Sequence, residues 1–327
     1  MFKVREKLEK SAKMMREAYC ETLMALAEEN KDIVALDADL VSSSGMKPFF
    51  KKFPERAINV GIAEANMIGI AAGLSAVGKI PFAHSFGCFA SRKTCDQVMI
   101  SAAYAKLNVK ILGSDPGVTA TYNGGTHMPF EDVGVLRSIP KITIIEMTDP
   151  VMVADIVRQV AGIYGVHYLR MARKNVTAIY EEGSTFEIGK GNILRDGKDV
   201  TIIASGIMVA EALRAADMLK EERIMARVVD MFTIKPVDVE LVERCARETR
   251  AIVTAENHNI YGGLGSAVSE AVCATHPVPV EMVGVKDRFG QVGTEDWLKK
   301  EYGLTAEEIV AAVKRVLPRK KRGILPI

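Results

Sequence analysis

The most informative stretch of this 327-residue chain is NVGIAEANM, residues 59–67. It places one carboxylate, Glu64, near the start of an almost wholly apolar run from Ile62 to Val77. Such a run predicts a helix that packs into the interior, so the carboxylate at its start is partly desolvated. A desolvated carboxylate is suited to proton transfer near neutral pH, and Glu64 is therefore the first candidate for a catalytic residue.

Apolar segments on both sides of this run alternate between strand and helix patterns. In the first half of the chain, strands are expected at residues 33–36, 80–82, 109–113, 142–145 and 167–170. Helices are expected at residues 7–29, 62–77, 89–105 and 150–164. This alternation is typical of a mainly parallel sheet that is covered by helices on both faces.

A second alternation begins after residues 180–199, which are rich in Glu, Gly and Lys. Its expected strands are residues 200–204, 226–229, 251–254 and 280–283. Its expected helices are residues 208–220, 237–248, 265–274 and 306–316. We therefore predict an α/β protein of two three-layer α/β/α domains with mainly parallel sheets, at residues 1–180 and 199–327, joined by a linker at residues 181–198.

Composition excludes several other classes of protein. The net charge is only +2, and basic side chains are interspersed with acidic ones, so no nucleic-acid-binding surface is expected. The five cysteines are widely spaced, which argues against a disulfide framework or a zinc site and fits a reducing cytoplasm. The longest apolar run, residues 67–78, is shorter than the about 20 residues that span a bilayer, so no membrane association is expected.

Four further motifs accompany the Glu64 stretch in order along the chain. The first predicted helix carries Arg16, and DADL follows at residues 37–40. Phe86 and Phe89 lie in the stretch AHSFGCF, and His127 lies in GGTHMP. This order resembles the transketolases, which use thiamine diphosphate. Because the chain lacks the Gly-Asp-Gly…Asn motif that binds metal and diphosphate in these enzymes, it resembles the C-terminal subunit of a split, two-chain transketolase.

The resemblance implies which residues contact the cofactor. In the family a glutamate hydrogen-bonds N1′ of the aminopyrimidine and so activates the cofactor, and Glu64 matches it within GIAE. Phe86 and Phe89 match an F-x-x-F pattern that supplies a flat apolar wall for the pyrimidine ring. Ile62 belongs to the same cofactor-binding set. His127 matches a histidine beside C2 of the cofactor, which stabilises an oxyanion or moves a proton.

The resemblance also implies a set of substrate-binding residues. Arg16, Ser43 and Arg173 match positions that bind the phosphate group of the sugar. Guanidinium groups suit this task because they bind phosphate or sulfonate oxygens bidentately. His127 and Asn123 complete the predicted set.

Several residues depart from the family pattern. Asn123 replaces the usual aspartate, and Asp115 stands where many relatives have histidine, so a non-standard ketose, including a modified or branched one, is a live alternative. Arg92 and Lys93 stand where the family often has Gly-Arg or aromatic residues, which leaves the shape of the pyrimidine pocket open. Asp39 is expected to orient the loop that follows it.

The glycine-rich stretch ENHNIYGGLG, residues 256–265, lacks the patterns of the nucleotide-binding loops. We interpret it as a structural turn from a strand into a helix. His258 within it is expected at a subunit contact or in a structural role.

The resemblance implies reversible transfer of a two-carbon ketol unit from a ketose phosphate to an aldose. It also implies an N-terminal partner subunit that binds the diphosphate through Mg²⁺ or Ca²⁺, no metal ligands in this chain, and a heterotetramer with cofactor sites at its interfaces. Two alternatives stay open: the β subunit of a 2-oxoacid dehydrogenase decarboxylase component, and a non-catalytic transketolase-like subunit. The Thr-His segment and the arginines argue against the first, and an intact Glu64 argues against the second.

Overall fold

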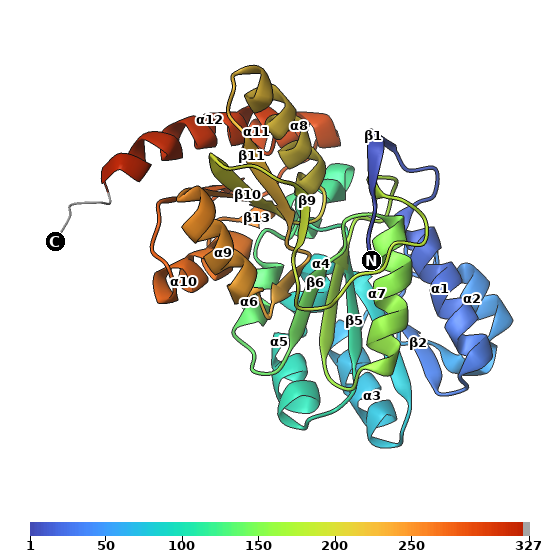
Figure 1. Cartoon of the computed structure of the whole chain (residues 1–327). Helices are drawn as coiled ribbons and strands as arrows, with labels where there is room; N and C mark the ends of the chain where they lie inside the picture. The colour runs from blue at the N-terminus through green and yellow to red at the C-terminus, as the bar shows by residue number, and fades with distance from the viewer. Residues whose placement is uncertain (323–327) are drawn as a thin grey trace.

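Two sheets, each covered by helices, organise the computed structural model, which describes residues 1–322 (Figure 1). The larger sheet has seven strands in the order β12-β6-β7-β5-β4-β2-β3, and every neighbouring pair is parallel except β12 with β6. Its strands are β2 (Ile33–Asp37), β3 (Ala57–Asn59), β4 (Ile80–Phe86), β5 (Lys110–Ser114), β6 (Thr143–Glu146), β7 (His167–Met171) and β12 (Thr233–Lys235).

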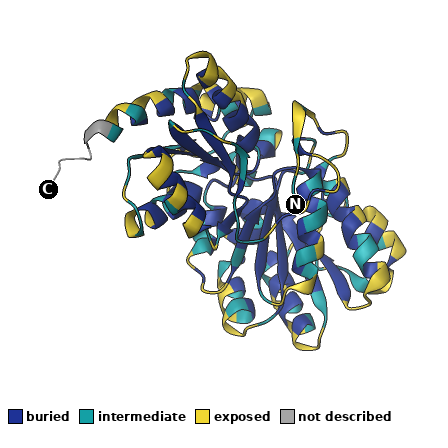
Figure 2. Ribbon diagram, viewed as in Figure 1, coloured by how far each residue is buried: buried dark blue, intermediate teal, exposed yellow. Residues whose placement is uncertain are grey.

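Helices cover both faces of this sheet. The α-helices are α1 (Met15–Glu29), α2 (Lys47–Lys52), α3 (Glu64–Ala76), α4 (Gly87–Ser91), α5 (Cys95–Gln97), α6 (Asp132–Arg137) and α7 (Pro150–Gly162). Helical segments of other types are the 3₁₀ turns η1 (Pro54–Arg56), η3 (Gly117–Asn123) and η4 (Gly125–His127) and the π-helical turn η2 (Val98–Tyr104). Successive strand residues point to opposite faces, so Phe82 packs in the cluster that contains α1 and α7, while Ala83 packs with α3. Figure 2 shows the strands buried between these layers.

The second sheet has five strands in the order β14-β13-β10-β11-β9, and only β9 is antiparallel to its neighbour. The strands are β9 (Asn192–Arg195), β10 (Val200–Ala204), β11 (Ala226–Asp230), β13 (Ile252–Asn259) and β14 (Val280–Val285). The helices are α8 (Met208–Glu221), α9 (Val239–Thr249), α10 (Leu264–Ala274), α11 (Glu295–Tyr302), α12 (Ala306–Val316) and the turn η5 (Leu317–Arg322). The predicted fold class of two α/β domains with mainly parallel sheets is confirmed.

The N-terminus differs from the sequence prediction. The expected helix at residues 7–29 begins only at Met15, and Val4–Lys10 instead form strand β1. This strand pairs antiparallel with β8 (Thr177–Tyr180), with Val4 opposite Tyr180 and Lys10 opposite Thr177. Lys and Glu favour helix locally, but pairing with a distant strand overrides that local preference.

The expected helix at residues 89–105 is also wrong as a single element. The segment divides into α4, α5 and the π-helical turn η2, Val98–Tyr104. π-Helical turns are rare, and they occur frequently at functional sites. The break lies directly after Phe89 and Arg92, beside the predicted cofactor wall.

Two strands lie where periodicity does not predict them. β9 lies within the segment expected as a linker, residues 181–198, and pairs with β11. β12 comes from the second half of the chain, yet it joins the first sheet beside β6. Strand β12 therefore ties the second half of the chain to the first sheet, in addition to the linker.

None of the helices among residues 1–322 combines the length and the apolar composition that a membrane span requires.

Candidate active site

Glu64 is the first residue of α3, at the point where the chain turns from β3 into the helix. Its side chain is only 3% exposed. A helix N-terminus favours a negative charge, because unpaired backbone N–H groups and the helix dipole point toward it. Glu64 Oε2 accepts a hydrogen bond from Nζ of Lys93 at 2.5 Å, and the Lys93 side chain is 47% exposed. Glu64 is thus a buried carboxylate paired with a lysine that water reaches.

Phe86, Phe89 and His127 form a cluster that we call the aromatic wall. Phe86 ends β4 and Phe89 lies in α4, and their ring centroids are 6.3 Å apart. His127 from η4 meets both rings edge-on, with centroid distances of 5.9 Å to Phe86 and 5.1 Å to Phe89. Nζ of Lys93 lies 5.1 Å from the centroid of Phe89. Lys93 therefore connects the aromatic wall to the carboxylate of Glu64.

Arg16 and Arg173, which we call the arginine pair, come from opposite ends of the first domain. Arg16 lies in α1, and Arg173 follows β7. Nη1 of each donates to the backbone carbonyl of Ser43, at 3.1 Å from Arg16 and 3.4 Å from Arg173. The guanidinium carbon of Arg173 lies 4.8 Å from the ring centroid of Phe86. The arginine pair therefore adjoins the aromatic wall, and Ser43 contacts it through its backbone.

Asp115 neutralises part of this positive charge. Its Oδ2 lies 2.5 Å from Nε of Arg173, and its Oδ1 accepts from the backbone N of Arg173 at 3.2 Å. Burial raises the pKa of the Asp115 carboxyl, while the Arg173 guanidinium opposes that rise. Asp115 therefore fixes the orientation of Arg173 and lowers the net charge that an anionic ligand meets.

The loop that carries Ser43 is held by two aspartates. Asp39, the residue expected to orient it, has its backbone N bonded to Oδ1 of Asn59 at 3.0 Å and its side chain bonded to Nδ2 of Asn59 at 3.3 Å. Asp37 was not singled out from the sequence, yet its Oδ2 accepts from the Ser44 hydroxyl at 2.9 Å. Burial raises the pKa of the Asp37 carboxyl to about 6. The DADL motif therefore shapes the loop beside the arginine pair.

Two predicted site residues lie apart from these contacts. Ile62 precedes α3 and is 77% exposed. Asn123 is exposed at the end of η3, and no hydrogen bond to its side chain is recorded within residues 1–322. Both face solvent in the single chain.

His84 lies behind the site and was not predicted to belong to it. Its Nε2 lies 3.1 Å from Oγ of Ser114, and its ring meets that of Tyr19 edge-on at 5.8 Å. Burial, reinforced by the nearby Arg173 charge, lowers the pKa of His84 to about 3. The ring is therefore neutral at physiological pH. Strand β4 is buried on both faces, so its sequence pattern carries no signal that separates His84 from core residues.

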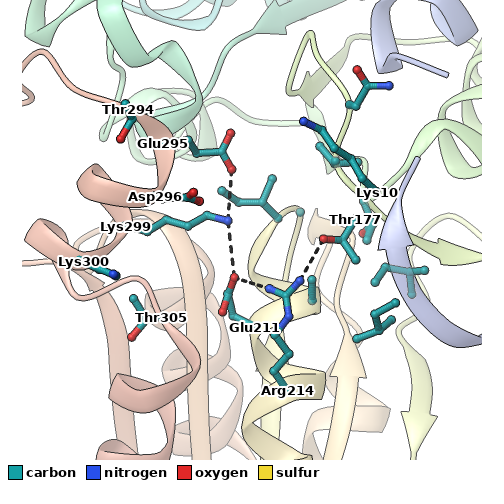
Figure 3. Close-up of a pocket in the computed structure, with 18 of the residues that line it drawn as sticks. Lys10, Thr177, Glu211, Arg214, Thr294, Glu295, Asp296, Lys299, Lys300 and Thr305 are labelled. Atoms are coloured by element: carbon teal, nitrogen blue, oxygen red, sulfur yellow. Dashed lines mark hydrogen bonds and ion pairs between the residues drawn. The ribbon is translucent and has the colours of Figure 1, made fainter. Parts of the chain in front are cut away.

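A cavity of about 590 Å³ lies elsewhere, between the start of the chain, α8 and α11 (Figure 3). None of the predicted site residues lines it. Its main charges pair with one another: Lys299 bonds Glu295 and Glu211, and Arg214 bonds Glu211 (Figure 3). These pairs neutralise part of the charge that lines the cavity, to which Lys10, Asp296 and Lys300 also contribute. Among residues 1–322, no group of three or more His, Cys, Asp or Glu side chains is arranged so that it could hold a metal ion.

Comparisons with known proteins identify the family of the chain. Residues 11–178 match the transketolase pyrimidine-binding domain, and residues 189–309 match the transketolase C-terminal domain. The chain is 52% identical to the 6-deoxy-6-sulfo-D-fructose transketolase subunit of Clostridium sp. (strain MSTE9), over 94% of this chain and 95% of that protein. It is 39% identical to a subunit of the apulose-4-phosphate transketolase of Phocaeicola vulgatus, over 90% of this chain and 94% of that protein.

A solved structure gives the same answer. It is described as a split-gene transketolase in an inactive β4 tetramer, and it matches with a TM-score of 0.88 and 46% identity over 94% of this chain and 99% of that one. The chain therefore belongs to the transketolase family, and its near relatives are subunits of split transketolases, which confirms the resemblance seen in the sequence. Human transketolase is 35% identical over 93% of this chain, which covers 49% of that longer protein.

Proposed function

We propose that this chain is the C-terminal, pyrimidine-binding half of a thiamine-diphosphate-dependent transketolase that transfers a two-carbon ketol unit from an anionic ketose to an aldose. The observation that carries the proposal is the convergence of Glu64, the aromatic wall and the arginine pair on one face of the first domain. The first two groups suit a cofactor ring, and the third suits the anionic end of a sugar.

The residues present fit an aminopyrimidine ring. The ring needs a flat apolar surface and a carboxylate that can share a proton with a ring nitrogen, and Phe89 and Glu64 supply these. Lys93 contacts both groups, so its ammonium stands in for the polar and π contacts that a ring would make. When bound, thiamine diphosphate supplies the carbanion chemistry.

Each residue of the candidate site that faces the cofactor or the reacting sugar has a proposed role in the reaction. Glu64 holds a proton at N1′ of the pyrimidine, and Phe86, Phe89 and Ile62 bind and orient that ring. His127 donates to the substrate oxygen that gains negative charge. Its Nδ1 lies 2.9 Å from Oγ1 of Thr126, which leaves Nε2 free to face a substrate.

The arginine pair is proposed to hold the anionic end of the ketose, with the Ser43 loop beneath it. The names of two relatives include a sulfonated and a phosphorylated sugar, and a guanidinium pair binds either oxyanion. Asn123 is proposed to contact sugar hydroxyls, because an amide both donates and accepts hydrogen bonds. The proposed donor is therefore a ketose with a terminal phosphate or sulfonate, from which a two-carbon unit is transferred to an aldose.

A partner subunit is proposed to supply the other half of the site. The chain covers only about half of human transketolase, at 49% of its length, and the missing half would carry the Mg²⁺ or Ca²⁺ ligands and the diphosphate site. The related split-gene structure is described as inactive in its β4 form, which supports a requirement for the partner. We propose a heterotetramer in the cytoplasm with two cofactor sites, and a division of the chain at residues 1–180 and 199–327.

The partner requirement is tested by calorimetry of thiamine diphosphate binding with Mg²⁺. The chain is measured alone and then mixed with the N-terminal subunit encoded beside it. Binding only in the mixture is expected. Tight binding by the chain alone would contradict a split site.

The substrate class is tested with the assembled complex. Fructose 6-phosphate, 6-deoxy-6-sulfofructose and uncharged fructose are offered as donors with an aldose phosphate as acceptor. At least one anionic ketose is expected to react with a kcat/KM about tenfold or more above that of fructose, because charge-assisted hydrogen bonds contribute about 1.5–3 kcal/mol each. In Arg16→Met, the KM for the anionic ketose should rise while turnover of fructose stays the same. Equal use of fructose would rule out an anion site, and acyl transfer to a lipoyl group would favour the decarboxylase alternative.

A further inference from the structure

The segment that bears His127 runs from Pro116 to Phe130, and the second domain holds both of its ends. Asn257, at the end of β13, donates from Nδ2 to the carbonyl of Pro116 at 2.9 Å, and its Oδ1 accepts from the backbone N of Val118 at 3.0 Å. Two residues later along the same strand, the backbone N of Asn259 donates to the carbonyl of Phe130 at 2.8 Å. One strand end of the second domain thus clamps the start and the finish of this segment.

The middle of the segment also rests on the second domain. Gly125 approaches Gly290 so closely that a Cβ at position 125 would collide with the carbonyl of Gly290. Gly124 is similarly close to Val292. The segment that carries His127 therefore touches the second domain at its two ends and in its middle.

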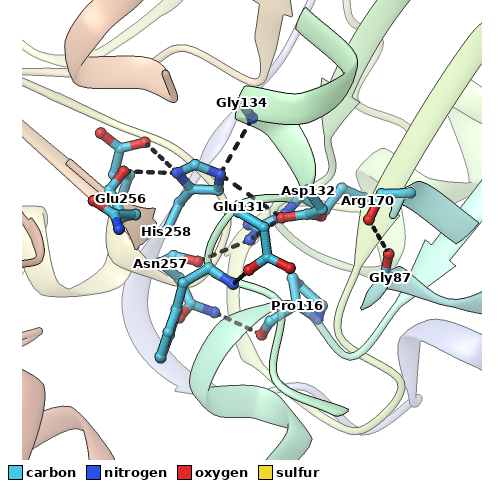
Figure 4. A network of polar contacts seen from close by, with 12 residues as sticks. Gly87, Pro116, Glu131, Asp132, Gly134, Arg170, Glu256, Asn257 and His258 are labelled. Atoms are coloured by element: carbon cyan, nitrogen blue, oxygen red, sulfur yellow. Dashed lines mark hydrogen bonds and ion pairs between the residues drawn. The ribbon is translucent and has the colours of Figure 1, made fainter. Parts of the chain in front are cut away.

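Asn257 is itself rigidly placed. Its side chain is fully buried, and its backbone carbonyl accepts from Nη2 of Arg170 at 2.8 Å (Figure 4). Arg170 in turn bonds Asp132 at 2.8 Å and 3.1 Å, and it also bonds Glu146. A buried, fully bonded network of this kind holds its members in one arrangement.

The amide of Asn257 is matched to its two partners on the loop. The loop needs a donor for the carbonyl of Pro116 and an acceptor for the backbone N–H of Val118, and an amide supplies both from one side chain. Gly117 stands between them with φ +50°, and a Cβ there would collide with Oδ1 of Asn257. The close approach of these two residues is therefore built into both.

We propose that Asn257 is a positioning residue, through which the second domain sets the place of His127 and Asn123 beside the substrate. This rests on the proposed function for the activity that it supports, but the clamp itself is a property of the chain. Asn257 is not proposed to contact the cofactor or the substrate. It acts by fixing the segment from Pro116 to Phe130.

The clamp is tested by hydrogen exchange with mass spectrometry on the assembled complex. In Asn257→Ala, amides of residues 116–130 are expected to exchange at least about tenfold faster, while peptides that cover α3 and β4 keep their wild-type rates. The matched control is Asn192→Ala, another buried asparagine, which lies in β9 of the second sheet and whose amide bonds Tyr180 and not the loop. Unchanged exchange in residues 116–130 would overturn the proposal, and this readout does not depend on any catalytic activity.

Kinetics of the same variants test the consequence for the substrate. For Asn257→Ala, kcat/KM for the anionic ketose should fall about tenfold or more. The Kd for thiamine diphosphate should stay within about twofold of wild type, since Asn257 bonds the segment of His127 and not Glu64, Phe86 or Phe89. A purely structural role would weaken cofactor binding and substrate use together, and that outcome would overturn the proposal. A loss of kcat/KM no larger than that of Asn192→Ala would overturn it as well.

A second variant covers the case in which Asn257→Ala does not fold. Gly125→Ala disturbs the same segment from its surface side, because the new methyl group meets Gly290. It should reproduce the loss of kcat/KM with unchanged cofactor binding. Gly73→Ala, on the exposed side of α3 with open space for a Cβ, is the control and should behave as wild type. Wild-type kcat/KM in Gly125→Ala would contradict the clamp.

Discussion

Two polar regions of this chain differ in how completely they are satisfied. Around Arg170, every guanidinium nitrogen bonds a partner within the chain, and the side chains of Arg170 and Asp132 are fully buried. Around Glu64, the carboxylate is buried, but its side-chain partner Lys93 is half exposed, His127 is only partly buried and Asn123 is exposed. The first region is complete in one chain, whereas the second presents groups that have contacts left to make. The polar groups around Arg170 are therefore satisfied within this chain, whereas those of the proposed site can still bind a ligand or a partner.

The largest effect is expected from Arg170→Met, which tests whether the buried network stabilises the fold. Removing the guanidinium leaves Asp132 and Glu146 buried without their charge partner, and the free energy of unfolding should fall by about 3–5 kcal/mol. Denaturant unfolding measures the change. The control is Arg247→Met, whose exposed pair with Glu243 is worth only about 0.3–0.5 kcal/mol. A loss no larger than that of the control would show that the network is not a main support of the fold.

The buried carboxyl of Asp230 allows a test by pH. The Tyr180 and Thr148 hydroxyls donate to its Oδ2 at 2.6 Å and 2.7 Å, and Asp149 and Glu146 are nearby carboxylates. Burial raises the pKa of Asp230 from 3.8 to about 7. Because the folded form binds the proton more tightly, this group stabilises the fold at about pH 4, and that stabilisation is lost as the pH rises toward 7.

Asp230→Asn should therefore remove a pH-dependent term of at most about 4 kcal/mol. Wild type loses stability relative to the variant between pH 4 and pH 7, as measured by urea unfolding at several pH values. Parallel pH profiles for the two proteins would contradict the raised pKa.

The site region is tested by Glu64→Ala in the assembled complex. If Glu64 holds a proton at the cofactor ring, kcat should fall at least about 10²-fold, the typical contribution of a positioned acid or base. The thermal unfolding midpoint should change little, because the substitution removes a single ion pair whose lysine is partly exposed. Full activity of the variant would exclude the proposed role of Glu64.

Lys93→Met gives the smallest expected effect. The ammonium of Lys93 bonds the Glu64 carboxylate and lies over the ring of Phe89, so a cofactor ring that contacts both groups must displace it. A pair with one partner this exposed is worth no more than about 1 kcal/mol, so thiamine diphosphate should bind up to about fivefold more tightly to the complex. Calorimetry on wild type and variant measures the change. Weaker binding in the variant would instead assign Lys93 a direct contact with the cofactor.

The contiguous parts of the site were accessible from the sequence. Glu64 follows its motif in one stretch, and Phe86 and Phe89 are separated by only two residues, so a strand end and the following helical turn bring them together. The ion pair of Lys93 with Glu64 was not predictable, because Lys93 lies in the turn that separates α4 from α5, where the sequence predicted one continuous helix. The missed roles of Asp37 and His84 are hidden in strands that are buried on both faces, where polar residues carry no periodic signal.

The sequence by itself determined the α/β class, the family and most of the residues that gather at the candidate site, because those depend on local periodicity and on short motifs. Only the tertiary structure decided that Val4–Lys10 form a strand, that β12 crosses into the first sheet, and that Arg16 and Arg173 meet at Ser43. It also decided that Asn257 reaches the segment of His127. These features join residues that are far apart in the chain, and contacts of that kind are set by the packing of whole sheets and helices rather than by any neighbouring residue.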